Sequence, residues 1–380
     1  MNDLKVFTAY QNNLNLERFS LMLDNNAQCY KFYWLEALVN LLVKDGKMIV
    51  SFDDAAVEMV LEAWYTISEY HLHMGSMYGS ESKNAIERAV NYIQSASGLS
   101  SSAGRDRITA AIDRVKNEPE FRKILLQMTD DVPYRLLSPF VPELKGNDRL
   151  WHSDRKLIEY FRLINQTTCL PYYMEYESHI NKYVHWNDSW ADMVRDNYII
   201  ILEWIRAKKI RYLQDRNPGV PGIVYKLDIS SARKLGEVHH LWDAVMEKED
   251  VIDIFSRTVL NGRRYDIDHF IPWSYVTTDE LWNLTPSEKK VNIMKSNHLP
   301  DWDTYFNSFV DNQIQLHSHI KNDAYIRNLF EKCRNKNLNT LWASDLYNID
   351  SQEQFRALLN ENMKPVYNAA KLQGYSLWSI

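Results

Sequence analysis

Apolar residues recur at three- and four-residue intervals through most of residues 1–215, the spacing that places them on one face of an α-helix. The clearest examples are residues 30–42 and 52–65, and the second follows Ser51, a residue type favoured at the N-cap. We therefore expect residues 1–215 to form a helical domain, with a flexible serine-rich connector at residues 95–104. Further helices are predicted at residues 85–93, 107–115, 118–128 and 190–205.

The helical pattern is broken most clearly at residues 217–222, which read Asn-Pro-Gly-Val-Pro-Gly. Two prolines and two glycines in six residues cannot continue a helix, so a domain boundary is predicted here. We expect a linker over residues 216–236, a second domain over residues 237–300 and a helical extension over residues 301–380. Helical spacing returns at residues 229–249, 302–309, 324–333 and 352–359.

Residues 265–271 carry a different pattern, because they alternate and are rich in β-branched and aromatic residues. This pattern predicts a strand, which places Asp268 and His269 side by side near its end. A second short strand is predicted at residues 281–285 and a helix at residues 286–297, with proline in its first turn. The expected fold is therefore mainly α, with a ββα unit embedded in helices.

The polar residues of this unit suit hydrolysis of a phosphodiester by one divalent ion. Asp268 offers a carboxylate and Asn292 an amide oxygen, which are hard ligands of the kind that Mg²⁺ prefers. His269 can take a proton from the attacking water near neutral pH. Lys295 lies three positions after Asn292 and shares its helix face, so it can reach the same phosphate. The expected cofactor is Mg²⁺ or Mn²⁺.

Three segments of this unit resemble the HNH (ββα-metal) nucleases, including the HNH domain of RNA-guided CRISPR nucleases and HNH proteins of bacterial defence systems. The segments are D-I-D-H-F-I-P-W-S, L-W-N-L-T-P and V-N-I-M-K-S-N-H-L-P, and the resemblance covers roughly residues 251–301. It implies that His269 is the general base and that Asn283 ties down the loop and orients the histidine. It also implies that Asp268 and Asn292 are metal ligands and that Lys295 contacts the phosphate or lies just behind the ligands.

The chain departs from many HNH relatives at the positions where they hold a structural zinc with Cys-x-x-Cys pairs. The corresponding residues are 255–257 and 291–294, and they contain no cysteine. The three cysteines of the chain are far apart, so we expect no structural zinc. The cysteines are Cys29, Cys169 and Cys333. Apolar packing is expected to replace the zinc, through Phe270, Trp273, Trp282, Leu284 and Met294.

The net charge of −6 means that the molecule as a whole does not attract DNA, so binding must rest on local basic patches. The candidate nucleic-acid contacts flank the predicted site: Arg263, Arg264, Lys289 and Lys290. A second basic run fits a solvated helix face at least as well: Arg206, Lys208, Lys209, Arg211 and Arg216.

Composition bounds the class of protein. With 380 residues, 45% of them hydrophobic and 13% aromatic, the chain can form two or three ordered domains. No apolar run approaches the ~20 residues that cross a bilayer, and the first residues lack the order of a signal peptide. Scattered cysteines also argue against a disulfide framework. We expect a cytoplasmic protein without a membrane partner, and the absence of a Walker A loop excludes P-loop nucleotide hydrolysis.

The leading functional hypothesis is a metal-dependent endonuclease acting on DNA in restriction or anti-phage defence. The defence role rests on the resemblance and on the helical extension, not on any single residue. An RNA-cleaving toxin is an alternative, because the same site handles the phosphate and does not choose the sugar. A non-catalytic nucleic-acid-binding subunit is a third reading. Residues 1–215 are expected to dock a sensor or ATPase partner, or another copy of the chain.

Overall fold

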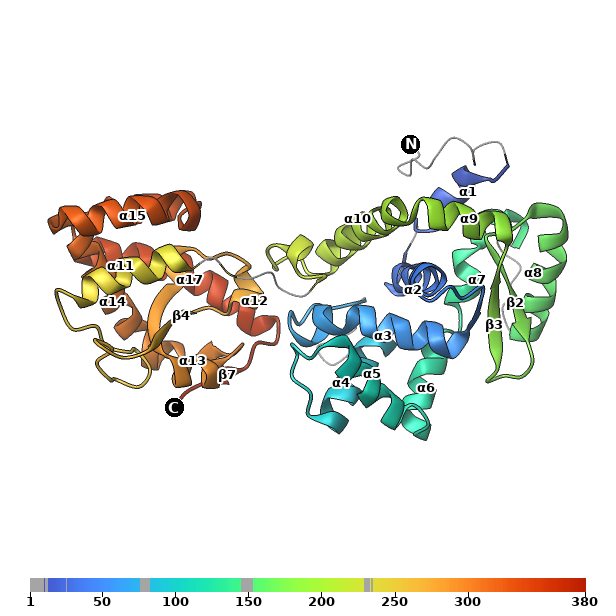
Figure 1. Cartoon of the computed structure of the whole chain (residues 1–380), viewed down its shortest axis with the longest axis horizontal. Helices are drawn as coiled ribbons and strands as arrows, with labels where there is room; N and C mark the ends of the chain where they lie inside the picture. Colours follow the sequence, from blue (N-terminus) through green and yellow to red (C-terminus); the bar gives the residue numbers. More distant parts are fainter. Residues whose placement is uncertain are drawn as a thin grey trace. The chain divides into compact units, whose positions relative to one another are not determined.

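The computed structural model describes residues 10, 13–24, 26–75, 83–144, 153–228, 233 and 235–380. These residues divide into two compact units, one reaching Pro218 and the other running from Gly219 to Ile380 (Figure 1). Helices dominate both units and the strands are few and short, which confirms the expected mainly α class.

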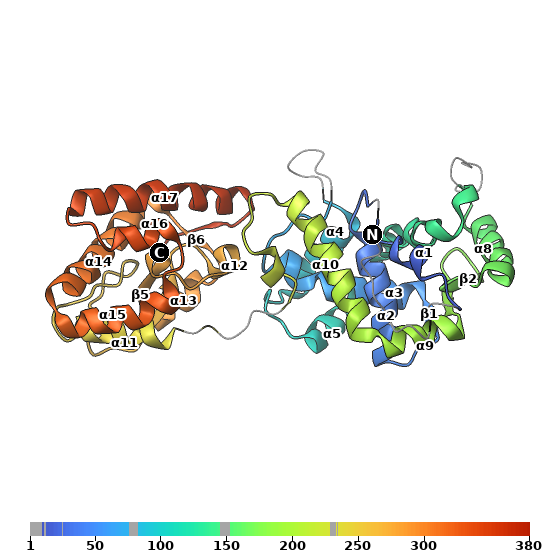
Figure 2. The same cartoon turned by 90° about the horizontal axis from the view of Figure 1, so that it is seen from above.

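The N-terminal unit is built around α2 (Tyr30–Lys44) and α3 (Phe52–Ser68), whose apolar residues are almost entirely buried. The side chain of Ser51 caps α3 by accepting a hydrogen bond from the backbone N–H of Asp54 at 3.0 Å. Helix α10 (Tyr198–Arg216) runs across α2 (Figure 2). The other helices are α1 (Leu16–Ser20), α4 (Ala85–Ser97), α5 (Arg105–Val115), α6 (Pro119–Met128), α7 (Val132–Leu136), α8 (Asp154–Thr168) and α9 (Asp188–Asp196).

A three-stranded antiparallel sheet corrects the expectation that residues 1–215 are helical throughout. Its order is β1 (Ile49–Ser51), β3 (Lys182–Trp186) and β2 (Tyr172–Tyr176). Strand β3 alternates buried and half-buried residues, with Val184 and Trp186 among the buried ones. This alternation and the aromatic content are strand signals that outweigh the neighbouring helical pattern.

The serine-rich connector, expected to be flexible, is held against α3 by hydrogen bonds. The indole nitrogen of Trp64 donates to the carbonyl of Ser101 at 2.9 Å. The hydroxyl of Tyr65 donates to the carbonyl of Ala103 at 2.7 Å. Because two α3 side chains satisfy its backbone, this loop has a defined path despite its small polar residues.

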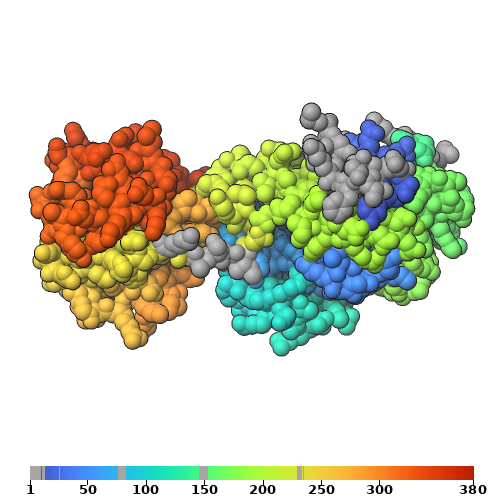
Figure 3. All heavy atoms as spheres, turned by 45° about the horizontal axis from the view of Figure 1, so that its top comes forward, coloured from blue at the N-terminus to red at the C-terminus, as the bar shows by residue number. Residues whose placement is uncertain are grey.

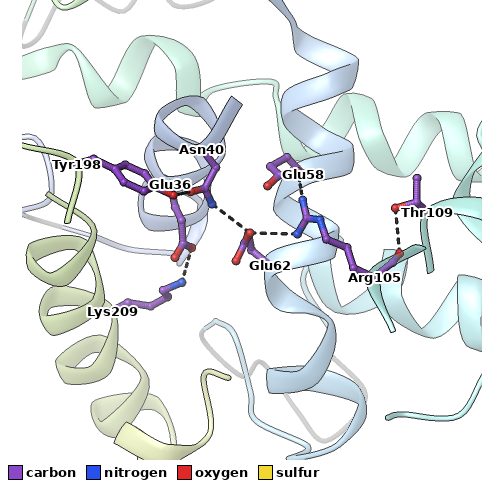
Figure 4. A network of polar contacts seen from close by, with 8 residues as sticks. All are labelled: Glu36, Asn40, Glu58, Glu62, Arg105, Thr109, Tyr198 and Lys209. Atoms are coloured by element: carbon purple, nitrogen blue, oxygen red, sulfur yellow. Dashed lines mark hydrogen bonds and ion pairs between the residues drawn. The ribbon is translucent and has the colours of Figure 1, made fainter. Parts of the chain in front are cut away.

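Polar contacts also join α10 to the centre of the N-terminal unit (Figure 4). Lys209, buried on α10, forms an ion pair with Glu36 of α2. On α3, burial raises the pKa of Glu58 to about 7, although Arg105 of α5 pairs with it and opposes that shift. Lys208 pairs with Asp24 at 2.9 Å. Two lysines of the second basic run are therefore ion-paired within the N-terminal unit, and the buried Lys209 is not part of the solvated helix face that was expected as the alternative.

The C-terminal unit surrounds a small hairpin with helices. Helix α14 (Trp302–Asn322) continues well past the predicted end at residue 309. The surface of α11 (Gly236–Met246) lies against that of α15 (Ala324–Asn337), as Figure 3 shows in yellow and orange-red. The helix predicted at residues 229–249 is thus shorter, and residues 229–232 and 234 lie outside the described residues. The unit is completed by α16 (Leu341–Leu346), α17 (Gln352–Leu372) and the short parallel pair β6 (Leu299–Pro300) and β7 (Leu377–Trp378).

The segment that follows the Pro/Gly break is fixed to the C-terminal unit. The hydroxyl of Tyr275, in the short helix α12 (Trp273–Val276), donates to the carbonyl of Gly219 at 2.7 Å. Buried Lys226 donates to the carbonyls of Tyr275, at 2.7 Å, and Ser274. Gly222 has φ +63°, and a Cβ there would collide with the Thr277 hydroxyl. Residues 219–226 therefore pack as part of this unit.

Candidate active site

A two-stranded antiparallel hairpin and a following helix form the centre of the C-terminal unit. Strand β4 (Tyr265–His269) pairs with β5 (Leu284–Glu288), so that Asp268 lies opposite Thr285 and His269 opposite Leu284. Helix α13 (Lys289–Lys295) follows β5 directly and packs on both strands. Two strands and a helix are therefore present in the predicted order.

The boundaries of the second strand and the helix differ from the prediction. Residues Leu281–Asn283 form a 3₁₀ turn, and the strand begins only at Leu284. Pro286, expected to begin the helix, lies within β5 opposite Ile267. A two-stranded sheet tolerates this proline because each strand has an open edge, where the missing N–H needs no partner.

Asp253 holds the loop before β4 to the end of β5, a role that the sequence analysis missed. Its fully buried carboxylate accepts hydrogen bonds from the backbone N–H of Phe255 at 2.8 Å and of Glu288 at 2.7 Å. It also accepts one from the hydroxyl of Ser287 at 3.2 Å. These bonds join the two chain segments through a single side-chain carboxylate.

Apolar packing supports the hairpin from α14, largely as predicted. Phe270 is fully buried, and its ring centroid lies 4.7 Å from that of Phe309. Trp282 and Leu284 are buried as well. Met294 was expected in this cluster, but its side chain is 52% exposed. Helix α13 buries only Val291 and Lys295, one turn apart, so Met294 points away from the hairpin.

The carboxylate of Asp268 is buried and paired with Lys295. The ammonium nitrogen lies 3.2 Å from Oδ1 and 3.0 Å from Oδ2 of Asp268, and it donates to the carbonyl of His269 at 2.7 Å. Lys295 is only 1% exposed, and these contacts fasten α13 to β4 from the inside. Asn292, half-buried, lies one turn earlier on α13.

His269 is buried and its two ring nitrogens differ in their surroundings. Nε2 lies 3.0 Å from Oδ1 of Asp279, whereas Nδ1 has no hydrogen-bond partner among the described residues. Burial lowers the pKa of His269, and the contact with Asp279 opposes that shift. An ionised carboxylate only accepts, so Nε2–H donates to Asp279 and the lone pair remains on Nδ1. The ring is therefore poised as a neutral base.

Asn283 secures the loop between the strands through the backbone of Ile271. Its Oδ1 accepts from the Ile271 N–H at 2.8 Å, and its Nδ2 donates to the Ile271 carbonyl at 2.8 Å. Its own carbonyl accepts from the N–H of Phe270 at 2.8 Å. Asn283 is thus hydrogen-bonded to the backbone of two consecutive loop residues, Phe270 and Ile271. The side chain that contacts the imidazole is Asp279, which lies four positions before Asn283 and could have been suspected only from its place in this acidic loop.

Residues 253–301 match the family model described as HNH endonuclease. This segment is an HNH endonuclease domain. No curated protein and no solved structure matches the chain. The match begins at Asp253 and ends at Asp301, so it contains the hairpin, α13 and the predicted site residues. It confirms the HNH resemblance and supports a nuclease activity.

The four cations predicted to contact nucleic acid gather at one end of the HNH hairpin. Arg263 and Arg264 directly precede β4, and Lys289 and Lys290 directly follow β5. The first residue of β4 pairs with the last residue of β5, so both pairs lie at the same end. All four side chains are exposed, which leaves them accessible to phosphates.

The donor set of the HNH domain fits one divalent ion of the Mg²⁺ or Mn²⁺ type. Oδ2 of Asp268 is buried and makes no hydrogen bond among the described residues, although it lies beside the Lys295 ammonium. Such an oxygen, with the amide of Asn292, offers hard ligands and leaves the remaining positions to water and phosphate. Among the described residues, no group of three or more His, Cys, Asp or Glu could hold a metal ion.

No helix in the described ranges is long and apolar enough to cross a membrane.

Proposed function

We propose that the chain is a divalent-metal-dependent endonuclease that hydrolyses phosphodiester bonds in DNA. The observation that carries the proposal is the arrangement of His269, directly after a buried carboxylate on the same strand. One ring nitrogen is held by Asp279, and the other has no hydrogen-bond partner in the part of the chain that the structure describes. The match of this segment to the HNH endonuclease model supports the same reading.

In the proposed mechanism, Nδ1 of His269 accepts the proton of the water that attacks the phosphorus. Asp279 keeps the ring oriented and accepts the Nε2–H bond as positive charge develops on the imidazole. Asp268 and Asn292 would hold the ion, which when bound supplies stabilisation of charge on the phosphate and on the departing oxygen. Arg263, together with its neighbouring cations, would hold the flanking backbone.

The decisive experiment is a nicking assay on supercoiled plasmid with the full chain. We expect relaxed plasmid to accumulate with Mg²⁺ or Mn²⁺ and not with EDTA. Cleavage of RNA with DNA left intact would instead favour the RNA-cleaving toxin. DNA binding without cleavage of either substrate under all these conditions would favour the non-catalytic subunit.

The purified protein is expected to contain no stoichiometric zinc. The segments where many relatives carry Cys-x-x-Cys pairs, residues 255–257 and 291–294, contain no cysteine, and the hydrogen bonds of Asp253 to Phe255 and Glu288 hold the loop before β4 to the end of β5 through a carboxylate. Elemental analysis after size-exclusion chromatography measures this directly. One zinc per chain that resists brief dialysis against EDTA would contradict the expectation.

Substitution of the two asparagines by alanine should separate their roles. Asn283→Ala removes two hydrogen bonds to Ile271 and is expected to destabilise the unit by about 1–3 kcal/mol. Asn292→Ala should leave stability nearly unchanged and raise the Mn²⁺ concentration needed for half-maximal cleavage. Thermal unfolding and Mn²⁺ titrations of both variants test this, and excess Mn²⁺ should rescue Asn292→Ala more than Asn283→Ala. Equal rescue of both would contradict the assignment.

We further propose that the N-terminal unit regulates the nuclease in a cytoplasmic anti-phage defence system by docking a protein partner or a second copy of the chain. An unrestrained DNA nuclease would damage its own host, and the N-terminal sequence carries no groove-reading motif. The supporting observation is that the C-terminal unit is compact by itself from Gly219 onward.

A fragment beginning at Gly219 is therefore expected to fold and to nick plasmid without sequence preference. It should start at Gly219 and not later, because hydrogen bonds with the hydroxyl and carbonyl of Tyr275 hold Gly219 and Lys226 to the C-terminal unit. Circular dichroism and plasmid nicking compare it with the full chain. A folded but inert fragment, beside a full chain that alone cuts a defined sequence, would show that the N-terminal unit itself reads DNA.

A further inference from the structure

The contact between His269 and Asp279 is built into the fold and does not rest on a free surface carboxylate. The side chain of Asp279 is only 19% exposed, and its Oδ1 lies 3.0 Å from Nε2 of the fully enclosed imidazole. A carboxylate at this distance selects the tautomer with the proton on Nε2. It also restricts rotation of the ring, so that Nδ1 keeps one direction.

The backbone that carries Asp279 is held by the turn between α15 and α16. The side-chain nitrogen of Asn337 donates to the carbonyl of Asp279 at 2.7 Å. The neighbouring Glu280 is buried, and its carboxylate accepts from the backbone N–H of Asn339 at 3.0 and 3.1 Å and of Thr340 at 3.4 Å. A neutral amide–carbonyl bond therefore holds Asp279, and charge-assisted bonds hold the next residue of the loop, Glu280.

The residues that bond to Asp279 and Glu280 lie outside the segment that matches the HNH family model. They are Asn337, Asn339 and Thr340. The match ends at residue 301, whereas the turn that holds the Asp279 loop spans residues 337–340. The helical extension after the family domain therefore contacts the loop whose Asp279 side chain reaches the imidazole.

We infer that Asp279 is a positioning residue for His269 and that the C-terminal helical extension forms part of the active-site framework through Asn337. The inference rests on the proposed nuclease function. In this inference the extension packs around the hairpin and also positions the catalytic base, because it holds the loop that carries Asp279.

The first test is Asp279→Asn in the full chain, with Asp303→Asn as the matched control, since Asp303 is an exposed residue on α14 of the same unit. The neutral amide is expected to lower the single-turnover cleavage rate about 10- to 100-fold, less than complete loss of the histidine base. The Mn²⁺ concentration for half-maximal activity and the DNA affinity should change less than twofold, because the proposed mechanism gives Asp279 no contact with the metal ion or with DNA.

A spectroscopic readout separates positioning from general stability. Protein labelled with ¹⁵N-histidine, with the His269 signals assigned by their loss in His269→Ala, reports which ring nitrogen carries the proton. We expect Nε2–H in the wild type and in Asp303→Asn, and a substantial share of Nδ1–H in Asp279→Asn. An unchanged tautomer together with an unchanged cleavage rate in Asp279→Asn would overturn the inference.

The second test compares two asparagines of the same turn. Asn337→Ala removes the donor to Asp279, whereas Asn339→Ala leaves the backbone N–H that holds Glu280 in place. We expect about a fivefold slower cleavage for Asn337→Ala, at temperatures where both variants are folded, and nearly wild-type cleavage for Asn339→Ala. Equal rates would overturn the role of the extension.

The experiments distinguish failure of the proposed nuclease function from failure of the positioning role of Asp279. If the wild type cut neither DNA nor RNA, the ¹⁵N spectra of wild type and Asp279→Asn would still decide whether Asp279 sets the tautomer of His269. If His269→Ala abolished cleavage while Asp279→Asn cut at the wild-type rate with the wild-type tautomer, the function would stand and the positioning role would be wrong.

Discussion

Replacement of His269 by alanine is expected to slow DNA cleavage by about 10²–10⁴-fold, the contribution typical of a positioned general base. The unpartnered Nδ1 of His269 is the proposed proton acceptor, and alanine offers no substitute for it. Metal binding and DNA binding should remain nearly unchanged, because Asp268, Asn292 and the exposed cations are left in place. Single-turnover nicking and fluorescence-anisotropy binding measure the two properties separately.

The control for this variant is His317→Ala. His317 is also buried in the C-terminal unit, where its ring packs 4.9 Å from that of Phe355 between helices. Its loss removes a buried imidazole of the same size, so it should cost comparable stability without touching the hairpin. Cleavage by His269→Ala at the rate of His317→Ala would show that the histidine is not the base.

The sequence was informative about the HNH unit because its signals are local. The alternation around Asp268 and His269, the loop residue Asn283 and the helix carrying Asn292 occur in order within about forty residues. The order of strand, strand and helix followed from these patterns. The boundary between the second strand and the helix was predicted wrongly. Pro286 suggested a helix start, whereas pairing of β5 with β4 extends the strand to Glu288.

The residues missed at the site are those whose roles depend on tertiary contacts. Asp253 acts through segments 34 and 35 positions away, and Asp279 is held by Asn337, 58 positions later. Helical spacing predicted that Lys295 shares a helix face with Asn292. It could not predict that the Lys295 side chain is buried against β4, because burial depends on tertiary packing. Likewise β1 pairs with β3 across more than a hundred residues, a contact that no local pattern near residue 49 indicates.

The buried pair of Lys295 and Asp268 leads to the second large expected effect. Lys295→Met keeps the unbranched stem of the side chain but removes the ammonium group, leaving the Asp268 carboxylate and the His269 carbonyl without their donor. Removal of one partner of a buried ion pair typically costs about 3–5 kcal/mol, because the other charge stays buried and uncompensated. In EDTA, the C-terminal unit of this variant should therefore unfold at a markedly lower temperature than in the wild type.

Divalent metal should reverse part of this loss if Asp268 is a metal ligand. In the wild type the Lys295 ammonium already neutralises the Asp268 carboxylate. A bound metal ion therefore stabilises the folded wild type less than it stabilises folded Lys295→Met, where the negative charge is unbalanced. Binding to the folded state alone raises its stability by mass action, so Mn²⁺ should raise the unfolding temperature of Lys295→Met more than that of the wild type. Lys290→Met is the matched control, because Lys290 is exposed on the same helix. This variant should unfold at the wild-type temperature in EDTA, and Mn²⁺ should raise that temperature no more than in the wild type. An equal Mn²⁺ shift in all three proteins would mean that Asp268 serves only as the partner of Lys295, and the metal would have to be held elsewhere.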